Sequence, residues 1–538
     1  MSETGSNGNR GQGHGGRGGE GHRGPRGGVK RNAQGRERNR GPQRGFSENA
    51  PSQRTRRADP ARLVAFEVLR AVAAEDAYAN LVLPARIRHH GLDKRDAGFA
   101  TELSYGALRG QGTYDAILAR CVDRPLEQLD PAILDALRIG AHQLLAMRVP
   151  AHAALDETVG LARAVIGAGP SGLINAVLRK VSAHTLEEWL DLLLSDEQDQ
   201  TKVASVRYAH PEWIVRAFRQ SLVAHGRPVT EIDELLEADN AAPVVNLVAL
   251  PGLGSLDEAV ESGATPGELV EGSALSSGGD LGRLASVRDG STRVQDVGSQ
   301  LVARALASVD LSDATAGDGG DGASASDGAS ASDDATTAGG ERWLDLCAGP
   351  GGKAALLGAL ARQHGATLLA NEPAPHRAKL VRQALSAVPH EVWHVRTGDG
   401  REVGSEMAES FDRVLVDVPC TGLGALRRRP ESRWRRTPKD LVDLGPLQRE
   451  LLKSALDAVK PGGVVAYVTC SPHPAETTAV VSDALRKRDD LELLDAGAAL
   501  DAVSLTGHLE AGHELTAQLW PHRHRTDAMF LALIHKKA

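Results

Sequence analysis

Cysteine is scarce in this chain of 538 residues, and its few cysteines follow no recognised spacing. The four are Cys121, Cys347, Cys420 and Cys470, and no Cys-x-x-Cys pair occurs. A disulfide scaffold needs a dense framework of cysteines, and a structural zinc site needs grouped Cys and His ligands. The spacing therefore excludes both and favours a reducing cytoplasm as the location.

Long apolar runs are also missing, so nothing reads as a transmembrane span or a signal peptide. We expect a cytoplasmic monomer without a membrane partner and without a bound metal. The chain is too long for one hydrophobic core, which predicts three or four domains.

Charge is unevenly distributed along the chain. Residues 1–57 hold twelve Arg and one Lys against four Glu, a net charge of +9, so the remainder carries −17 of the total of −8. This Arg/Gly-rich segment has almost no apolar content and is predicted to be a disordered tail. It suits either loose contact with RNA phosphates or a purely solubilising role.

Residues 58–190 are predicted to form an all-α bundle. Asp59-Pro60 and Asp130-Pro131 are typical helix starts, with an N-cap followed by proline at the first helical position. A third apolar stripe runs over residues 173–181. Residues 200–310 alternate helical and strand-like patterns, which predicts a small α+β module.

Residues 311–340 hold six Asp and no basic residue, and are predicted to be a disordered acidic insert. The pattern over residues 341–538 alternates strands with helices, which predicts a parallel sheet covered on both faces. Expected strands are 343–347, 367–371, 392–395, 413–417 and 464–469. Ligands of such sheets gather at the carboxyl ends of the strands.

The first of these strands runs into a Gly-rich turn, formed by Cys347, Ala348, Gly349, Pro350, Gly351, Gly352 and Lys353. The turn is not a phosphate-binding Walker motif, which requires Ser or Thr after the lysine. Glu372 closes the next strand, where a carboxylate can bind ribose hydroxyls, and Asp399 follows the third, where it could bind an adenine amino group. These positions in strand order suggest S-adenosylmethionine as cofactor.

Two cysteines follow predicted strand ends, in Asp417-Val418-Pro419-Cys420 and in Thr469-Cys470-Ser471. Free cysteine is commonly a buried apolar residue. Beside a cofactor turn, however, a thiolate can add to carbon 6 of a cytosine and make carbon 5 nucleophilic enough to accept a methyl group. Asp417 is placed to stabilise the adduct near ring nitrogen 3, although Asp also caps turns. This chemistry alone leaves open which cysteine attacks.

Between the two cysteines, residues 427–436 contain six arginines and Trp434. Arginine and an aromatic ring in one loop favour phosphate contact and base stacking. The alternative is a solvated run of charge.

The motifs around the Gly-rich turn, Asp417–Cys420, residues 467–471 and residues 525–530 resemble the RsmB (Sun/Fmu) family of bacterial small-subunit ribosomal RNA cytosine-C5 methyltransferases. The resemblance covers about residues 58–538 without the acidic insert. It implies a multidomain protein: an N-terminal NusB-like RNA-binding bundle, a small α+β module, and a C-terminal α/β, Rossmann-like class I methyltransferase domain over 341–538.

The resemblance also implies roles for single residues. Cys470 would be the nucleophile, and Cys420 would assist product release. The Gly-rich turn, Glu372, Asp399 and Asp417 would line the cofactor pocket. Gly349 departs from the family pattern, in which Ala is common.

Small-subunit ribosomal RNA is therefore the expected partner. A transfer-RNA substrate remains an alternative, as does a non-catalytic RNA-binding assembly factor that keeps the cofactor fold. A DNA enzyme of this chemistry would use Cys420 as nucleophile.

Overall fold

The computed structural model describes residues 58–311 and 340–538. The predicted Arg/Gly-rich tail, and the predicted acidic insert apart from its two end residues, lie outside the described residues.

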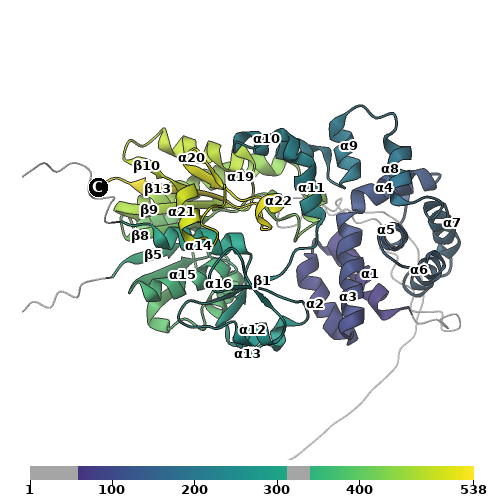
Figure 1. The fold of residues 1–538 in the computed structure, drawn as a ribbon, viewed down its shortest axis with the longest axis horizontal. Coiled ribbons are helices and arrows are strands. Elements are labelled where there is room, and N and C mark those ends of the chain that lie inside the picture. The colour runs from purple at the N-terminus through teal and green to yellow at the C-terminus, as the bar shows by residue number, and fades with distance from the viewer. Residues whose placement is uncertain (1–57, 312–339) are drawn as a thin grey trace, which may run out of the picture. The chain divides into compact units, whose positions relative to one another are not determined.

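The first described part of the chain is helical, as the sequence predicts (Figure 1). Both predicted helix starts are confirmed, because Asp59 accepts the backbone N–H of Arg62 at 2.9 Å and Asp130 accepts that of Ala132 at 2.8 Å. The helices are α1 (Pro60–Glu75), α2 (Ala79–His90), α3 (Lys94–Arg109), α4 (Gln111–Cys121), α5 (Pro131–Leu145), α6 (Ala151–Val165), α7 (Ser171–Val181), α8 (Leu186–Leu194) and α9 (Gln200–Arg207).

Two helices, α10 (Glu212–Ala224) and α11 (Ile232–Asn240), lead into a small antiparallel sheet. The strand order of that sheet is β2-β3-β1-β4. The elements are β1 (Asn246–Ala249), α12 (Asp257–Glu261), β2 (Thr265–Pro266), β3 (Ser273–Leu275), α13 (Ala285–Asp289), β4 (Thr292–Val294) and then α14 (Val297–Ser308). The five-part division that the sequence suggests stays a proposal.

The rest of the chain builds one large sheet with its covering helices. The elements are β5 (Arg342–Asp345), α15 (Gly352–Gln363), β6 (Thr367–Asn371), α16 (Pro375–Ala384), β7 (Trp393–Arg396), α17 (Gly400–Glu406), β8 (Phe411–Asp417), α18 (Ser432–Arg435), α19 (Pro438–Ala458), β9 (Val459–Thr469), α20 (Thr478–Leu485), β10 (Leu491–Leu494), α21 (Ala496–Val503), β11 (Gly512–His513), β12 (Thr516–Gln518), α22 (Pro521–His524) and β13 (Phe530–Lys536).

The five predicted strands are present and parallel to their neighbours, in the order β9-β8-β5-β6-β7. The sheet is not parallel throughout, however. β13 pairs antiparallel with β9, and β10, β11 and β12 extend that side, so the nine-stranded sheet is mixed. The antiparallel pairing of β13 with β9 joins segments that are separated in sequence by α20, β10, α21, β11, β12 and α22.

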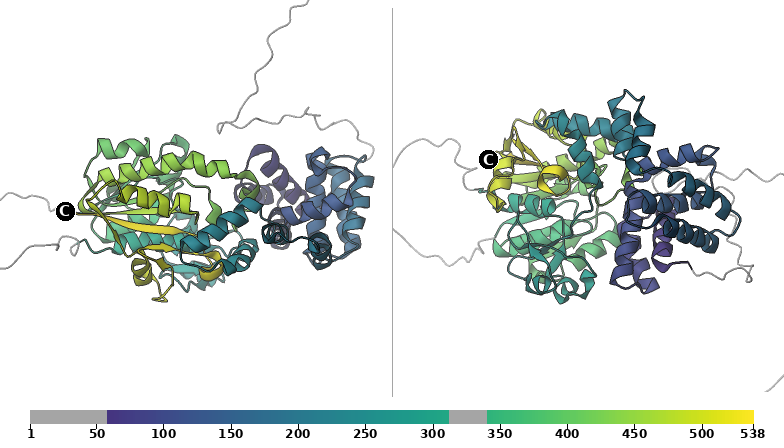
Figure 2. Two further views of the ribbon diagram at one scale, coloured as in Figure 1. Left: turned by 90° about the horizontal axis from the view of Figure 1, so that it is seen from above. Right: turned by 45° about the vertical axis from the view of Figure 1, so that its right-hand side comes forward.

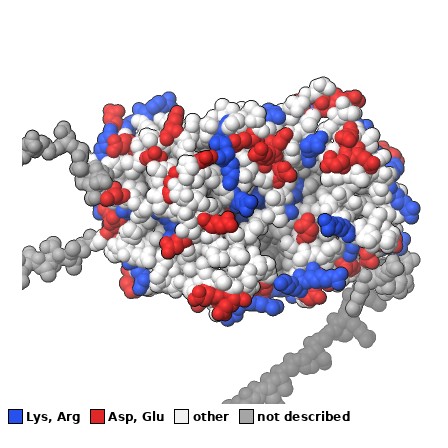
Figure 3. Space-filling view, in the orientation of Figure 1, with Lys and Arg blue, Asp and Glu red and all other residues white. Residues whose placement is uncertain are grey.

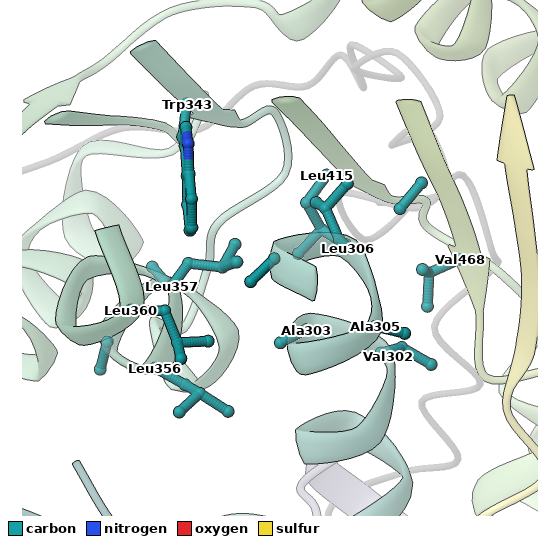
Figure 4. Close-up of a cluster of buried hydrophobic side chains, with 14 of the residues drawn as sticks. Val302, Ala303, Ala305, Leu306, Trp343, Leu356, Leu357, Leu360, Leu415 and Val468 are labelled. Carbon is teal, nitrogen blue, oxygen red and sulfur yellow. The ribbon is translucent and has the colours of Figure 1, made fainter. Parts of the chain in front are cut away.

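Alternate residues of the strands face two different cores, which places helices on both faces of the sheet (Figure 2). On one face, Trp343, Leu415 and Val468 pack against α14 and α15 (Figure 4). On the other face, Leu344, Val416 and Tyr467 pack with residues of α17 and α19. Burial on both faces fixes the strand register and so the position of every strand end.

Lys and Arg are interspersed with Asp and Glu over the face shown in Figure 3. None of the helices in the described part of the chain is long and apolar enough to cross a membrane.

Candidate functional site

The two cysteines of interest lie on adjacent loops at the carboxyl ends of neighbouring strands. β8 and β9 are parallel, and Asp417 at the end of β8 pairs with Val468 of β9. Each strand then turns into its cysteine loop, which brings the sulfur atoms of Cys420 and Cys470 to 3.3 Å from one another. Both side chains are only partly buried. The arrangement gives two thiols that one small molecule or base could contact together.

The charges around the two sulfurs differ. Hydrogen bonding from the Cys420 thiol lowers the pKa of Cys470 overall. Burial and the carboxylates of Asp417 and Asp527 oppose this shift, and the Lys353 ammonium adds to it. The pKa of Cys420 is raised by that same hydrogen bond and by burial, and the carboxylate of Glu476 adds to the shift. Cys470 is therefore the thiol that ionises first, and a thiolate is the reactive form.

Lys353 reaches this site from the Gly-rich turn. Its Nζ donates to the carboxylate of Asp417 at 2.8 Å. Burial alone would lower the pKa of Lys353, but the adjacent carboxylate of Asp417 raises it overall, so the lysine stays charged. Asp417 thus connects the Gly-rich turn to the cysteine pair.

Glu476 holds the Cys420 loop and was missed from the sequence. Its buried carboxylate accepts the backbone N–H of Thr421 at 2.8 Å and the hydroxyl of Thr421 at 2.5 Å. Gln448 of α19 donates both to Glu476 and to the carbonyl of Pro419. No local pattern signals this role, because Glu476 follows the other cysteine and comes close only when the strands pair.

The Gly-rich turn packs closely against Glu372. A Cβ atom at Gly349 would lie 2.1 Å from Oε2 of Glu372, so an alanine there would require the carboxylate to move. Gly351, with φ of +109°, lets the chain enter α15, and a Cβ there would meet Ala384 of α16 at 2.4 Å. The glycines therefore allow a close approach of the turn to its surroundings, and Glu372 faces the turn as the sequence predicts.

Asp345, at the end of β5, was not singled out from the sequence. Its side chain is buried, and neither carboxylate oxygen meets a side-chain donor, although the backbone N–H of Cys347 lies close enough to favour the charged form. Burial and then the charge of Asp417 raise the pKa of Asp345 to about 7. A carboxylate inside an otherwise apolar strand is the sequence signal that could have identified it. A buried acid beside the turn that no side chain pairs with fits a ligand that supplies a hydrogen-bond donor or a positive charge.

Asp399 lies at the N-terminus of α17, where it accepts the backbone N–H of Arg401 at 2.9 Å. Hydrogen bonding from the Arg401 side chain lowers the pKa of Asp399. Arg396 links this position to the neighbouring strand, because it donates to Asn371, the residue before Glu372, and to the carbonyl of Asp399. Glu372 and Asp399 therefore lie at the ends of adjacent strands, as predicted.

The arginines of residues 427–436 do not all serve as the sequence suggests. Arg433 is completely buried and donates to the carbonyls of Arg109 and Asp239 and to the side chain of Asn240. Arg435 donates to the carbonyls of Val72, Asp76 and Ala77. These guanidinium groups satisfy carbonyls at the ends of α1, α3 and α11, which otherwise lack partners. Phosphate contact is therefore wrong for Arg433, and so is the alternative of a solvated charge.

Arg428 has a different role in the same segment. It forms a bidentate ion pair with Asp527, whose side chain is fully buried. The backbone N–H of Asp527 and the hydroxyl of Thr526 both contact Asp296, which caps α14. This network fixes the segment before β13 against the loop that follows Cys420.

Within residues 58–311 and 340–538, no group of three or more His, Cys, Asp or Glu side chains could hold a metal ion.

Comparisons with known proteins cover nearly the whole chain. Residues 336–535 match the family described as 16S rRNA methyltransferase RsmB/F, and residues 59–183 match the NusB family. A relative from Mycobacterium tuberculosis, whose name describes it as a methyltransferase, is 47% identical over 487 residues, which cover 90% of this chain and 98% of the relative. The ribosomal RNA small subunit methyltransferase B of Pseudomonas putida is 30% identical over 443 residues, 81% of this chain and 91% of that protein.

Among solved structures, the crystal structure of PH0851 is similar, with a TM-score of 0.68, 20% sequence identity, and coverage of 89% of this chain and 100% of that one. This likeness supports the fold alone.

Proposed function

The chain belongs to the 16S rRNA methyltransferase RsmB/F family, and we propose that it methylates carbon 5 of a cytosine in small-subunit ribosomal RNA through a covalent adduct with Cys470. The observation that carries the proposal is the pair of sulfurs 3.3 Å apart at the ends of β8 and β9. Similar relatives named for the ribosomal small subunit support the choice of RNA. We infer a cytoplasmic location from that substrate.

S-adenosylmethionine is the proposed cofactor, and it would supply a methyl group on a sulfonium ion. The residues proposed to hold it are Cys347 to Lys353, Glu372, Asp399 and Asp417. The buried carboxylate of Asp345, which no side chain pairs with, supports a cationic or hydrogen-bond-donating ligand beside the turn. The close contact of Gly349 with Glu372 supports placing Glu372 in this set, because it brings the carboxylate against the turn.

Cys470 is the proposed nucleophile because its surroundings favour the thiolate. Its sulfur adds to carbon 6 of the cytosine, which makes carbon 5 electron-rich. The Lys353–Asp417 pair, next to the sulfurs, is proposed to hold the pyrimidine at ring nitrogen 3 and to stabilise the charge that develops there.

Cys420 is proposed to assist release. After the methyl group is on carbon 5, the proton on that carbon must leave to a base and the bond from Cys470 to carbon 6 must break. With Cys470 in the adduct, Cys420 is the adjacent ionisable sulfur and is fixed in place by the contacts of Glu476 to Thr421.

The test uses the purified full chain with methyl-labelled S-adenosylmethionine and either naked small-subunit ribosomal RNA or assembled subunits. We expect label in RNA, and bisulfite sequencing should locate it at one cytosine. Transfer RNA serves as the competing substrate. If neither form of ribosomal RNA took up label while the chain still bound RNA, a non-catalytic assembly factor would be the better interpretation.

A further inference from the structure

His225 is a buried residue at the end of α10, far in sequence from both cysteines. Its Nε2 lies 2.9 Å from the carbonyl oxygen of Pro472, two residues after Cys470. Because a carbonyl only accepts hydrogen bonds, Nε2 must carry the proton and donate it. Burial lowers the pKa of His225 to about 4, so the ring is neutral at physiological pH. The neutral ring keeps its proton on Nε2, where it donates to Pro472.

The ring of His225 also packs against aromatic residues near the point where β9 leads into the Cys470 loop. Its centroid lies 5.6 Å from that of Phe530 and 6.1 Å from that of Trp520. Phe530 begins β13 and pairs directly with Thr469, the residue before Cys470. One imidazole therefore contacts structure on both sides of the proposed nucleophile, through Phe530 before it and through Pro472 after it.

The pair of helices that carries His225 also packs on the other cysteine loop. Apolar residues of α10 and α11 form a cluster with Leu423 and Leu426, which follow Cys420 by a few residues. At the end of α11, Asn240 accepts a hydrogen bond from the buried Arg433 at 2.7 Å. Both loops are thus packed against one structural element that lies outside the large sheet.

We propose that α10 and α11 form a brace that sets the distance between the two cysteine loops, with His225 as the positioning residue for Cys470. The inference deepens the proposed function and rests on it. His225 touches neither reacting atom, so it acts only through the loop that it holds. A displaced sulfur costs rate because covalent attack needs the reacting atoms closely aligned, and an error near 1 Å can cost about a hundredfold.

Two variants of His225 separate the effect of its N–H donor from the effect of its buried ring. His225→Gln keeps an N–H at the reach of Nε2, whereas His225→Leu keeps a buried side chain without a donor. We expect His225→Leu to lower kcat for methylation by about tenfold or more, with KM for RNA little changed, and His225→Gln to recover most of that loss. His508→Leu, at an exposed histidine, is the control and should behave like the parent chain.

A second readout does not depend on RNA methylation. Alkylation of Cys470 by iodoacetamide, followed by mass spectrometry on the free protein, should slow in His225→Leu and recover in His225→Gln. Unfolding temperature checks that each variant is folded. An unchanged alkylation rate and an unchanged kcat in a folded His225→Leu protein would overturn the brace. If the parent chain transferred no methyl group, the proposed function would fail while the alkylation result still tested the brace.

Discussion

The Cys420 loop and the Cys470 loop follow adjacent parallel strands and end with their sulfurs in contact, yet the pKa values of the two thiols are shifted in opposite directions. The hydrogen bond between the thiols lowers the pKa of Cys470 and raises that of Cys420. Lys353 adds a positive charge near Cys470, against the carboxylates of Asp417 and Asp527, whereas Glu476 binds the Cys420 loop and adds a negative charge there. The two loops are thus alike in geometry and different in electrostatics.

This difference bears on the order of the proposed steps. A nucleophile must ionise readily, and a group that assists later must not compete for the same electrophile. The hydrogen bond from Cys420 favours the thiolate of Cys470, with a smaller contribution from Lys353. The same hydrogen bond and burial keep Cys420 protonated while the attack occurs, with a smaller contribution from Glu476. Pairing of the adjacent strands brings the two thiols together, and the contacts made by the two loops give the thiols different pKa values.

Of the replacements proposed here, that of Cys470 should cause the largest loss of methylation. Cys470→Ala removes the proposed nucleophile, and methylation should fall by about a thousandfold or more. Incorporation of labelled methyl groups into ribosomal RNA measures the loss. Cys121→Ala, at a buried cysteine of α4, is the matched control and should retain activity. Full activity in Cys470→Ala would assign the attack to another group.

Replacing Cys420 should separate attack from release. Cys420→Ala leaves the Cys470 thiol in place to form its adduct, although it removes the hydrogen bond that lowers the pKa of Cys470. It also removes the neighbour proposed to assist the elimination, so turnover should fall by about a hundredfold. Denaturing gel electrophoresis should reveal a stable RNA–protein complex. That complex should disappear in the double variant with Cys470→Ala. If Cys420→Ala instead failed to form any adduct, the roles of the two loops would be reversed.

Local signals explain which parts of this arrangement could be predicted. The helix starts at Asp59 and Asp130, the five parallel strands and the Gly-rich turn depend on neighbouring residues, and all were found from the sequence. The apolar run of β13 was available in the sequence but was not recognised as a strand, so the mixed sheet was missed.

Long-range contacts explain what could not be predicted. His225 meets Pro472 across 247 residues, and Arg433 meets Asn240 across 193. The composition of a charged segment does not predict which backbone carbonyls its arginines will contact. The burial of Arg433 therefore cannot be predicted from the sequence. Folding, rather than any motif, brings these partners together.

Neutralising Lys353 tests whether its positive charge favours the thiolate of Cys470. Lys353→Met removes a cation near Cys470 and leaves Asp417 without its partner. Both changes disfavour the thiolate, so the pKa of Cys470 should rise and the pH profile of its alkylation should move to higher pH. At neutral pH the reaction should slow several-fold. Lys353→Arg keeps the charge and should shift the profile much less, and equal shifts in both variants would exclude charge as the cause.

Neutralising Glu476 tests whether its negative charge raises the pKa of Cys420. This change should have the smallest effect on reactivity. In a Cys470→Ser background, Glu476→Gln removes a negative charge near Cys420, so the pKa of Cys420 should fall and its alkylation should quicken modestly at a given pH. The change should be smaller than that at Lys353, because Lys353→Met both removes a cation and frees the Asp417 carboxylate that raises the pKa of Cys470, whereas Glu476→Gln removes a single charge. The same variant weakens the contacts with Thr421 and should lower the free energy of unfolding by about 1 to 2 kcal/mol. A loss of stability without any change in alkylation would mean that Glu476 serves only to hold the loop, and the electrostatic contrast would then depend on Lys353 alone.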